Sequence, residues 1–196
     1  MIEAETQNPT GTDTKIIEAA IRCFLRYGAR KTSMGDIAKA ASVSRQTLYD
    51  LFGNKDELIC ASIRAVSDES LADIRARLVP LTNLGQMLDA YYEENVVKSF
   101  EMLQVSDDPQ DLISGHNEAG RAEIAKARRK HEALIAECLE PYGAELEKSG
   151  HSVEGIAHYF VTVTMSFKYE ATDLADLEAL YKVLRQTVLS AVGQSS

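Results

Sequence analysis

Apolar residues recur along most of the chain at three- and four-residue steps, the spacing typical of amphipathic helices. The first such pattern begins at Thr14 and is followed by Gly28, a residue type that commonly ends helices. Two short patterns and a long one precede Pro80, and a loop is expected at 106–110. The predicted helices span 14–27, 34–41, 45–52, 55–79, 84–103, 124–138, 153–171 and 173–192.

The chain is predicted to be all-α. Alternation of apolar and polar residues, which would indicate a strand, occurs only briefly at 161–164 (VTVT). Residues 1–12 are polar, contain Pro9 and Gly11, and are expected to form a disordered N-terminal arm. We therefore predict a small three-helix unit over residues 13–60, followed by a larger C-terminal helical bundle over residues 61–196.

The stretch IAKAASVSRQTLYDLFGNKDEL, residues 37–58, has the pattern of a helix-turn-helix. The second helix of this motif places its N-terminal end in the major groove, so the polar residues there are candidate DNA contacts. Arg45 can bind a guanine or a phosphate, Gln46 can read adenine, and the Thr47 methyl can meet a thymine methyl. The hydroxyls of Ser44 and Tyr49 can bind phosphates, as can Lys55 at the start of the next helix. The predicted DNA contacts are Thr32, Ser33, Ser44, Arg45, Gln46, Thr47, Tyr49 and Lys55.

The spacing alone also fits a plain helix-loop-helix whose polar residues are only solvated. The segment TSMGDIAKAASVSRQTLYDLFGNKDEL, however, resembles the DNA-binding domain of the tetracycline-repressor (TetR) family of transcriptional regulators, and the resemblance covers about residues 13–60. The family often has glycine where this chain has Ser42, so a serine at positive φ is expected in the turn. The matching residues are Thr32, Ile37, Ala38, Ala41, Val43, Ser44, Thr47, Leu48, Tyr49, Phe52, Lys55 and Leu58.

The net charge of −9 at first argues against a nucleic-acid partner, but the charges are unevenly distributed. Residues 13–55 contain eight basic and four acidic side chains, so this segment carries +4 and the remaining residues carry −13. A basic head on an acidic body can direct one end of the chain towards a polyanion such as DNA.

The resemblance implies a homodimer whose last two helices pair with those of a second copy, here about 153–171 and 173–192. The apolar stripe on the last helix is wide enough to suggest that it contributes to this interface. The predicted dimer residues are Leu177, Leu180, Tyr181, Leu184 and Val188.

The resemblance also implies that the middle helices enclose a pocket for a small molecule. Aromatic and methionine side chains at helical spacing are more often plain core, yet some could line such a pocket. His131 lies on an apolar helical face, where a core histidine bonded to a neighbour is the favoured interpretation and a ligand contact is the alternative. The candidate ligand contacts are Tyr91, Tyr92, Phe100, Met102, His131, Tyr159, Met165 and Tyr169.

No metal site and no cofactor are predicted, because the four histidines show no metal-ligand spacing. The three cysteines, Cys23, Cys60 and Cys138, lie in apolar-periodic stretches and are best interpreted as small buried hydrophobic residues. A redox-sensing thiol is the alternative. The chain lacks a secretory signal pattern and a long apolar run, so a cytoplasmic location is expected.

Together these features predict a ligand-responsive, dimeric transcriptional regulator that binds a near-palindromic DNA operator, acts as a repressor, and is released by a small, largely apolar effector. The first alternative is a DNA-binding regulator without a small-molecule ligand, switched by cysteine oxidation. The second is an α-helical enzyme, which would need convergent acid/base groups or metal ligands, whereas the carboxylates here are scattered.

Overall fold

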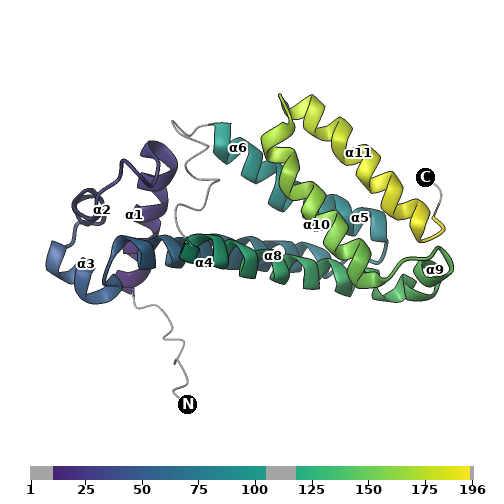
Figure 1. Cartoon of the computed structure of the whole chain (residues 1–196), viewed down its shortest axis with the longest axis horizontal. Helices are drawn as coiled ribbons and strands as arrows, with labels where there is room; N and C mark the ends of the chain where they lie inside the picture. Colours follow the sequence, from purple (N-terminus) through teal and green to yellow (C-terminus); the bar gives the residue numbers. More distant parts are fainter. Residues whose placement is uncertain (1–10, 105–117, 195–196) are drawn as a thin grey trace, which may run out of the picture. The chain divides into compact units, whose positions relative to one another are not determined.

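The structure is a computed structural model, and it describes residues 11–104 and 118–194 (Figure 1). The described residues form helices and connecting turns without a strand, which confirms the predicted all-α class. The helices are α1 (Gly11–Tyr27), α2 (Met34–Ala41), α3 (Arg45–Phe52), α4 (Lys55–Leu78), α5 (Leu84–Tyr91), the π-helix η1 (Tyr92–Val97), α6 (Lys98–Gln104), α8 (Glu118–Leu139), the 3₁₀-helix η2 (Glu140–Tyr142), α9 (Gly143–Lys148), α10 (Val153–Glu170) and α11 (Leu174–Ala191).

Most predicted helices are confirmed, with three corrections. Helix α1 begins at Gly11, so Gly11 and Thr12 are helical rather than part of a disordered arm; the rest of the predicted arm lies outside the described residues, as does the loop predicted at 106–110. The segment expected as one helix over 84–103 contains a π-helical turn between α5 and α6. Helix α9 was not predicted.

The described residues divide into two compact units. The first comprises 11–65 and 118–123, and the second comprises 66–104 and 124–194. Helices α4 and α8 each contribute residues to both units.

The first unit packs α1, α2, α3 and the start of α4 around one small core. Ile16, Ile37 and Leu48 are fully buried there, and Ala38 and Ala41 keep the helices close. Leu51, on the same helix as Leu48 and Phe52, is 44% exposed. Because α3 has only eight residues, one buried leucine and the half-buried Phe52 are enough to hold it.

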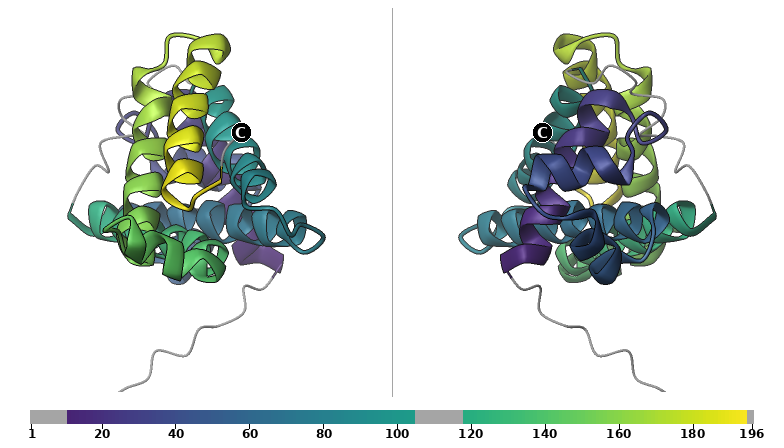
Figure 2. Two further views of the ribbon diagram at one scale, coloured as in Figure 1. Left: turned by 90° about the vertical axis from the view of Figure 1, so that its right-hand side faces the viewer. Right: turned by 90° about the vertical axis from the view of Figure 1, so that its left-hand side faces the viewer.

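The second unit is a helical bundle with a larger core drawn from α4, α5, η1, α6, α8, α9, α10 and α11. Helices α10 and α11 lie side by side in every view (Figures 1 and 2), joined by a short turn around Asp173, whose carboxylate caps α11. Buried Phe160 and Leu184 belong to the same core as Leu88 and Leu139. The predicted VTVT strand-like stretch lies inside α10.

Candidate nucleic-acid interface and ligand-binding region

The turn between α2 and α3 is held by main-chain hydrogen bonds around a left-handed serine. Ser42 has φ 56° and ψ 42°, which confirms the positive φ expected there. The Val43 N–H donates to the Ala38 carbonyl at 3.0 Å, the long bond of a Schellman-type helix end. Serine adopts this left-handed conformation less readily than glycine. The main-chain hydrogen bonds of the turn stabilise it here.

Two hydroxyl residues precede α2, and they have different roles. Thr32 is buried, and its hydroxyl donates to the Gly28 carbonyl at 2.8 Å. This hydroxyl ties α2 to the end of α1, and a contact of Thr32 with DNA stays a prediction. Ser33 is exposed and is the N-cap of α2, where it forms a capping box with Asp36. The Ser33 hydrogen bonds are the main cause of the lowered pKa of the Asp36 carboxyl.

Helix α3 presents a polar outer face because buried Leu48 fixes its inner face. Ser44 is the N-cap, and its hydroxyl oxygen accepts the Thr47 N–H at 3.0 Å. Gln46 is exposed and donates to the Asp50 carboxylate at 2.7 Å. The ring of Tyr49 is 48% exposed. The predicted base and phosphate contacts Ser44, Gln46 and Tyr49 therefore share an accessible surface.

Two cationic residues flank this face. The guanidinium of Arg45 lies across the first turn of α2 beside Gly35, where a Cβ added to Gly35 would be 2.6 Å from Arg45 Nη2. Lys55 begins α4, and its ammonium donates to the Arg30 carbonyl at 3.4 Å. The α4 start is capped by Asn54, whose side-chain oxygen accepts the Glu57 N–H at 3.0 Å. These positions suit contacts with phosphates on either side of a groove.

The candidate ligand contacts in the second unit fall into two groups. Tyr91, Tyr92 and Phe100 are buried, and Tyr92 stacks on Tyr181 with ring centroids 3.9 Å apart. Met165 is partly buried against the core. The side chains of Met102, Tyr159 and Tyr169 are exposed. The structure does not bring these seven residues together around one cavity.

His131 is buried in the second unit, with 7% of its surface exposed. Its ring meets the Tyr91 ring edge-on at 5.7 Å between centroids. His131 is buried, as expected of a core histidine, but its Nδ1 has no hydrogen-bond partner. Burial lowers the pKa of His131 to about 4, with the charges of Lys168 and Lys130 contributing.

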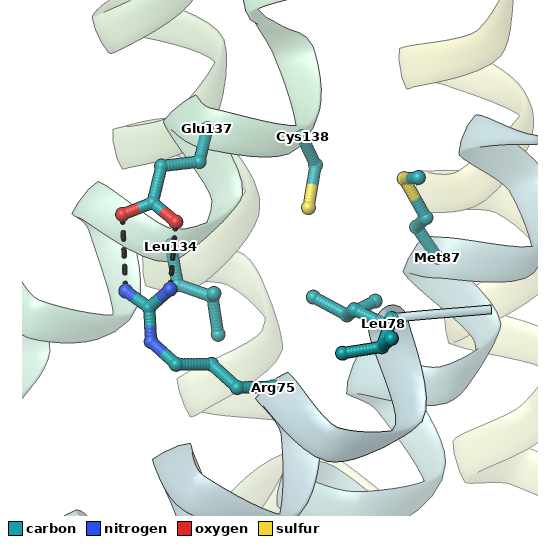
Figure 3. A pocket seen from close by; sticks show the side chains of 7 residues that line it. Arg75, Leu78, Met87, Leu134, Glu137 and Cys138 are labelled. Carbon is teal, nitrogen blue, oxygen red and sulfur yellow. Dashed lines mark hydrogen bonds and ion pairs between the residues drawn. The ribbon is translucent and has the colours of Figure 1, made fainter. Parts of the chain in front are cut away.

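A cavity of about 320 Å³ lies between α4, α5 and α8, and none of the predicted ligand residues lines it (Figure 3). One side carries the Arg75–Glu137 pair, in which two guanidinium N–H groups donate to the carboxylate at 2.8 and 3.0 Å. Both partners are about half exposed, and the bonds from Arg75 lower the pKa of Glu137. The other lining residues are Leu78, Val79, Met87, Leu134 and Cys138.

The N-terminal unit matches a known family. The sequence model of bacterial regulatory proteins of the tetR family matches residues 16–61, which hold α1, α2, α3 and the start of α4. The transcriptional regulator TtgR of Pseudomonas putida is 35% identical over 68 residues, and AcrR of Shigella flexneri is 26% identical over 160 residues. The chain belongs to the TetR family. The members of this family are transcriptional regulators rather than enzymes, which confirms that part of the prediction.

The similarity to individual TetR-family members differs in extent. The match with TtgR covers 35% of this chain and 32% of TtgR, whereas the match with AcrR covers 79% and 70%. A transcriptional regulator from Saccharomonospora viridis, solved in complex with choline, superposes with a TM-score of 0.67 at 14% identity. That superposition covers 89% of this chain and 94% of the other. The TetR-like fold therefore extends beyond the matched N-terminal segment.

Four of the five residues predicted for a TetR-type dimer interface are already buried inside one protomer. Leu177, Tyr181, Leu184 and Val188 belong to the core of the second unit, and Leu180 packs partly against it. The Tyr181 hydroxyl donates to Asp89 at 2.7 Å, and Arg185 forms two further bonds to the same carboxylate. These bonds tie α11 to α5, so the four buried side chains pack within one protomer, and their part in a dimer stays a prediction.

Two of the three cysteines of this TetR-family chain give little support to the redox alternative, whereas Cys60 is only partly buried. Cys23 and Cys138 are buried, and burial raises the pKa of both thiols, that of Cys138 to about 11. Because the thiolate is the reactive form, such thiols oxidise slowly. In residues 11–104 and 118–194 no three histidine, cysteine or carboxylate side chains are grouped as metal ligands would be. No helix in those same ranges has the length and apolarity needed to cross a membrane.

Proposed function

We propose that this TetR-family chain binds double-stranded DNA in the cytoplasm as a homodimer, represses transcription at a near-palindromic operator, and is released by a small, largely apolar effector. The observation that carries the DNA proposal is the outer face of α3. Leu48 fixes the helix from inside, while Gln46 and Tyr49 are exposed on the outside. A short recognition helix presented in this way can read base edges in the major groove.

The DNA proposal predicts two different variant phenotypes. Gln46→Ala should relax the preference at one base pair per half-site by about 1–3 kcal/mol, because it removes a candidate base-edge contact. Lys55→Ala should weaken binding to all DNA sequences about equally, because it removes a phosphate contact. For the same reason it should reduce the slope of log affinity against log salt concentration by about 1.

Both variants can be tested with duplexes selected by the wild-type chain from a random-sequence library. Fluorescence anisotropy at several salt concentrations then compares each selected duplex with single-base variants and with a random duplex. Lys182→Ala, an exposed lysine on α11, is the matched charge control. If selection with the wild-type chain enriches no duplex, DNA binding itself is contradicted.

The homodimer proposal rests on the outer faces of α10 and α11. Val183 is 70% exposed, and Tyr159 and Tyr169 are also exposed large apolar side chains. On α11, Leu180 and Ala191 lie between this exposed side and the core, against which both are partly buried. Exposed apolar side chains that cluster on packed helices suit association with a second copy of the chain.

The effector proposal rests on the cavity between α4, α5 and α8 (Figure 3). Its volume of about 320 Å³ falls at the lower end of the range for small-molecule sites. Leu78, Met87 and Leu134 give it an apolar lining, while Arg75 and Glu137 supply polar groups at one side. The structurally similar regulator from Saccharomonospora viridis was solved in complex with choline, which supports a small-molecule ligand for this chain.

A further inference from the structure

The position of the Arg45 side chain raises a question about its role on DNA. Arg45 is the first residue of α3, yet its guanidinium lies back over α2 rather than extending beyond α3. A Cβ built on Gly35 would come within 2.6 Å of Nη2 and 3.0 Å of Cζ and Nε. Such contacts are too short for real atoms, so a side chain at position 35 would displace the flexible end of Arg45 from this arrangement.

The surroundings of the guanidinium favour an anionic partner. In the part of the chain that the structure describes, no carboxylate forms a salt bridge with Arg45; the nearby Asp36 is bonded to Ser33, and the Arg45 charge contributes to its lowered pKa. Gly35 lies in the first turn of α2, where main-chain N–H groups lack intrahelical acceptors. The arginine donors and these N–H groups therefore lie at the same end of the same helix.

The location on α2 decides between the two DNA roles open to Arg45. In a helix-turn-helix the first helix crosses the DNA backbone, and only the second enters the groove. Here α2 is the first helix of the motif, so a guanidinium lying on it is placed beside phosphates and away from base edges. Arginine binds phosphate through two parallel N–H donors, which gives orientation as well as affinity.

We propose that Gly35 is a positioning residue for DNA binding: its lack of a side chain lets Arg45 lie across the first turn of α2 and bind a backbone phosphate rather than a guanine. This inference rests on the proposed DNA-binding function. It assigns Gly35, which the sequence patterns did not single out, and it narrows the role of Arg45.

The test is a double-mutant cycle of Gly35→Ala and Arg45→Ala. The probes are a duplex selected by the wild-type chain from a random-sequence library and a random duplex of equal length. Arg45→Ala should weaken both duplexes by a similar factor, about tenfold, and lower the salt slope by about 1. Gly35→Ala should also weaken binding to both duplexes. It should have no further effect on binding when residue 45 is already alanine.

Folding controls separate positioning from damage to α2. Gly35→Ala raises helix propensity, so its melting temperature should be equal to or above that of the wild type. Ala40→Gly, at an exposed α2 position, changes helix propensity in the opposite direction and should leave the salt slope unchanged. Additive effects of Gly35→Ala and Arg45→Ala would overturn the proposal, as would an Arg45→Ala effect confined to one base pair per half-site. Absence of any duplex binding by the wild type would instead refute DNA binding itself.

Discussion

At the scale of single residues, His131 shows how far a sequence pattern reaches. Its place on an apolar helical face correctly predicted burial, but the pattern could not show whether Nδ1 would find a partner. In the structure Nδ1 has none, and the ring packs edge-on against Tyr91. Burial disfavours the charged form of the imidazole, and the nearby Lys168 and Lys130 charges add to this effect.

This environment predicts acid sensitivity. Burial lowers the pKa of His131 from 6.5 to about 4, so between these values the unfolded chain binds more protons than the folded chain. Stability should therefore fall as the pH drops, by about 2 kcal/mol from this residue between pH 7 and 5.

The measurement is urea unfolding at pH 7 and pH 5 for the wild type, His131→Phe and His151→Gln. Phenylalanine keeps the ring packing but cannot be protonated, so His131→Phe should lose that part of the pH dependence. His151 is exposed, and its substitution should leave the pH dependence unchanged. An equal pH dependence in the wild type and His131→Phe would contradict the assigned pKa.

Other residues of the DNA-binding unit were predictable to different degrees. The left-handed Ser42, expected from the family resemblance, is confirmed, and the caps Ser33 and Ser44 agree with the usual preference for serine at helix starts. The hydrogen bond of Thr32 could not be predicted, because a hydroxyl before a helix can bond either outward or back to the previous helix. Only the packed position of the α1 end makes the Gly28 carbonyl its acceptor.

At the scale of helices, the sequence located most elements but could not assign their partners. The stripe on α11 was interpreted as a dimer surface because it is wide and apolar. A hydrophobic stripe shows only that a face is buried, and it does not distinguish a neighbour in the same chain from a second copy. The bonds from Tyr181 and Arg185 to Asp89 show that this face is directed towards α5.

Two adjacent residues of α11 test this distinction. Leu184→Glu should unfold the chain, because Leu184 is 3% exposed and a carboxylate there would be buried without a partner. Val183→Glu should leave the melting temperature nearly unchanged but produce monomers, because the introduced carboxylate would lie at the proposed interface between two copies. Circular dichroism and analytical ultracentrifugation measure the two effects. A well-folded dimer of Val183→Glu would contradict the proposed interface.

The π-helical turn at Tyr92–Val97 is another feature that periodicity did not predict. Across this turn the buried residues Tyr92, Val96 and Phe100 still recur at four-residue steps, which are also typical of an α-helix. The sequence therefore indicated one continuous helix over 84–103. The turn brings the Asn95 side chain to the Tyr91 hydroxyl, to which its amide donates at 3.0 Å.

At the scale of the whole molecule, the cavity could not be predicted because its lining comes from three helices that are distant in the sequence. The aromatic residues chosen as ligand contacts either fill the core or lie on the surface, whereas the cavity is lined by Arg75, Met87, Cys138 and their neighbours. Helix α4 contributes residues to both units, and Arg75 and Leu78 near its end line the cavity. A ligand there would contact a helix that begins beside the recognition helix.

The last prediction concerns coupling between effector and DNA. A dimer needs both recognition helices at grooves about one turn apart, so a small shift of α4 in each copy would weaken the second contact. A coupling of about 1–3 kcal/mol would change DNA affinity by about 5- to 150-fold, and the selected DNA must weaken effector binding by the same factor. Compounds that release the selected duplex should therefore bind more weakly in calorimetry when that duplex is present.

Variants locate the site of this effect. Met87→Trp should fill the cavity and abolish compound binding while leaving DNA affinity unchanged, because Met87 lines the cavity. Met102→Trp, at an exposed position outside the cavity lining, is the matched control and should respond like the wild type. If the compound binds equally well with and without DNA, the allosteric proposal is contradicted. If Met87→Trp still binds the compound, the effector occupies another site, because a tryptophan leaves too little of the cavity to hold it.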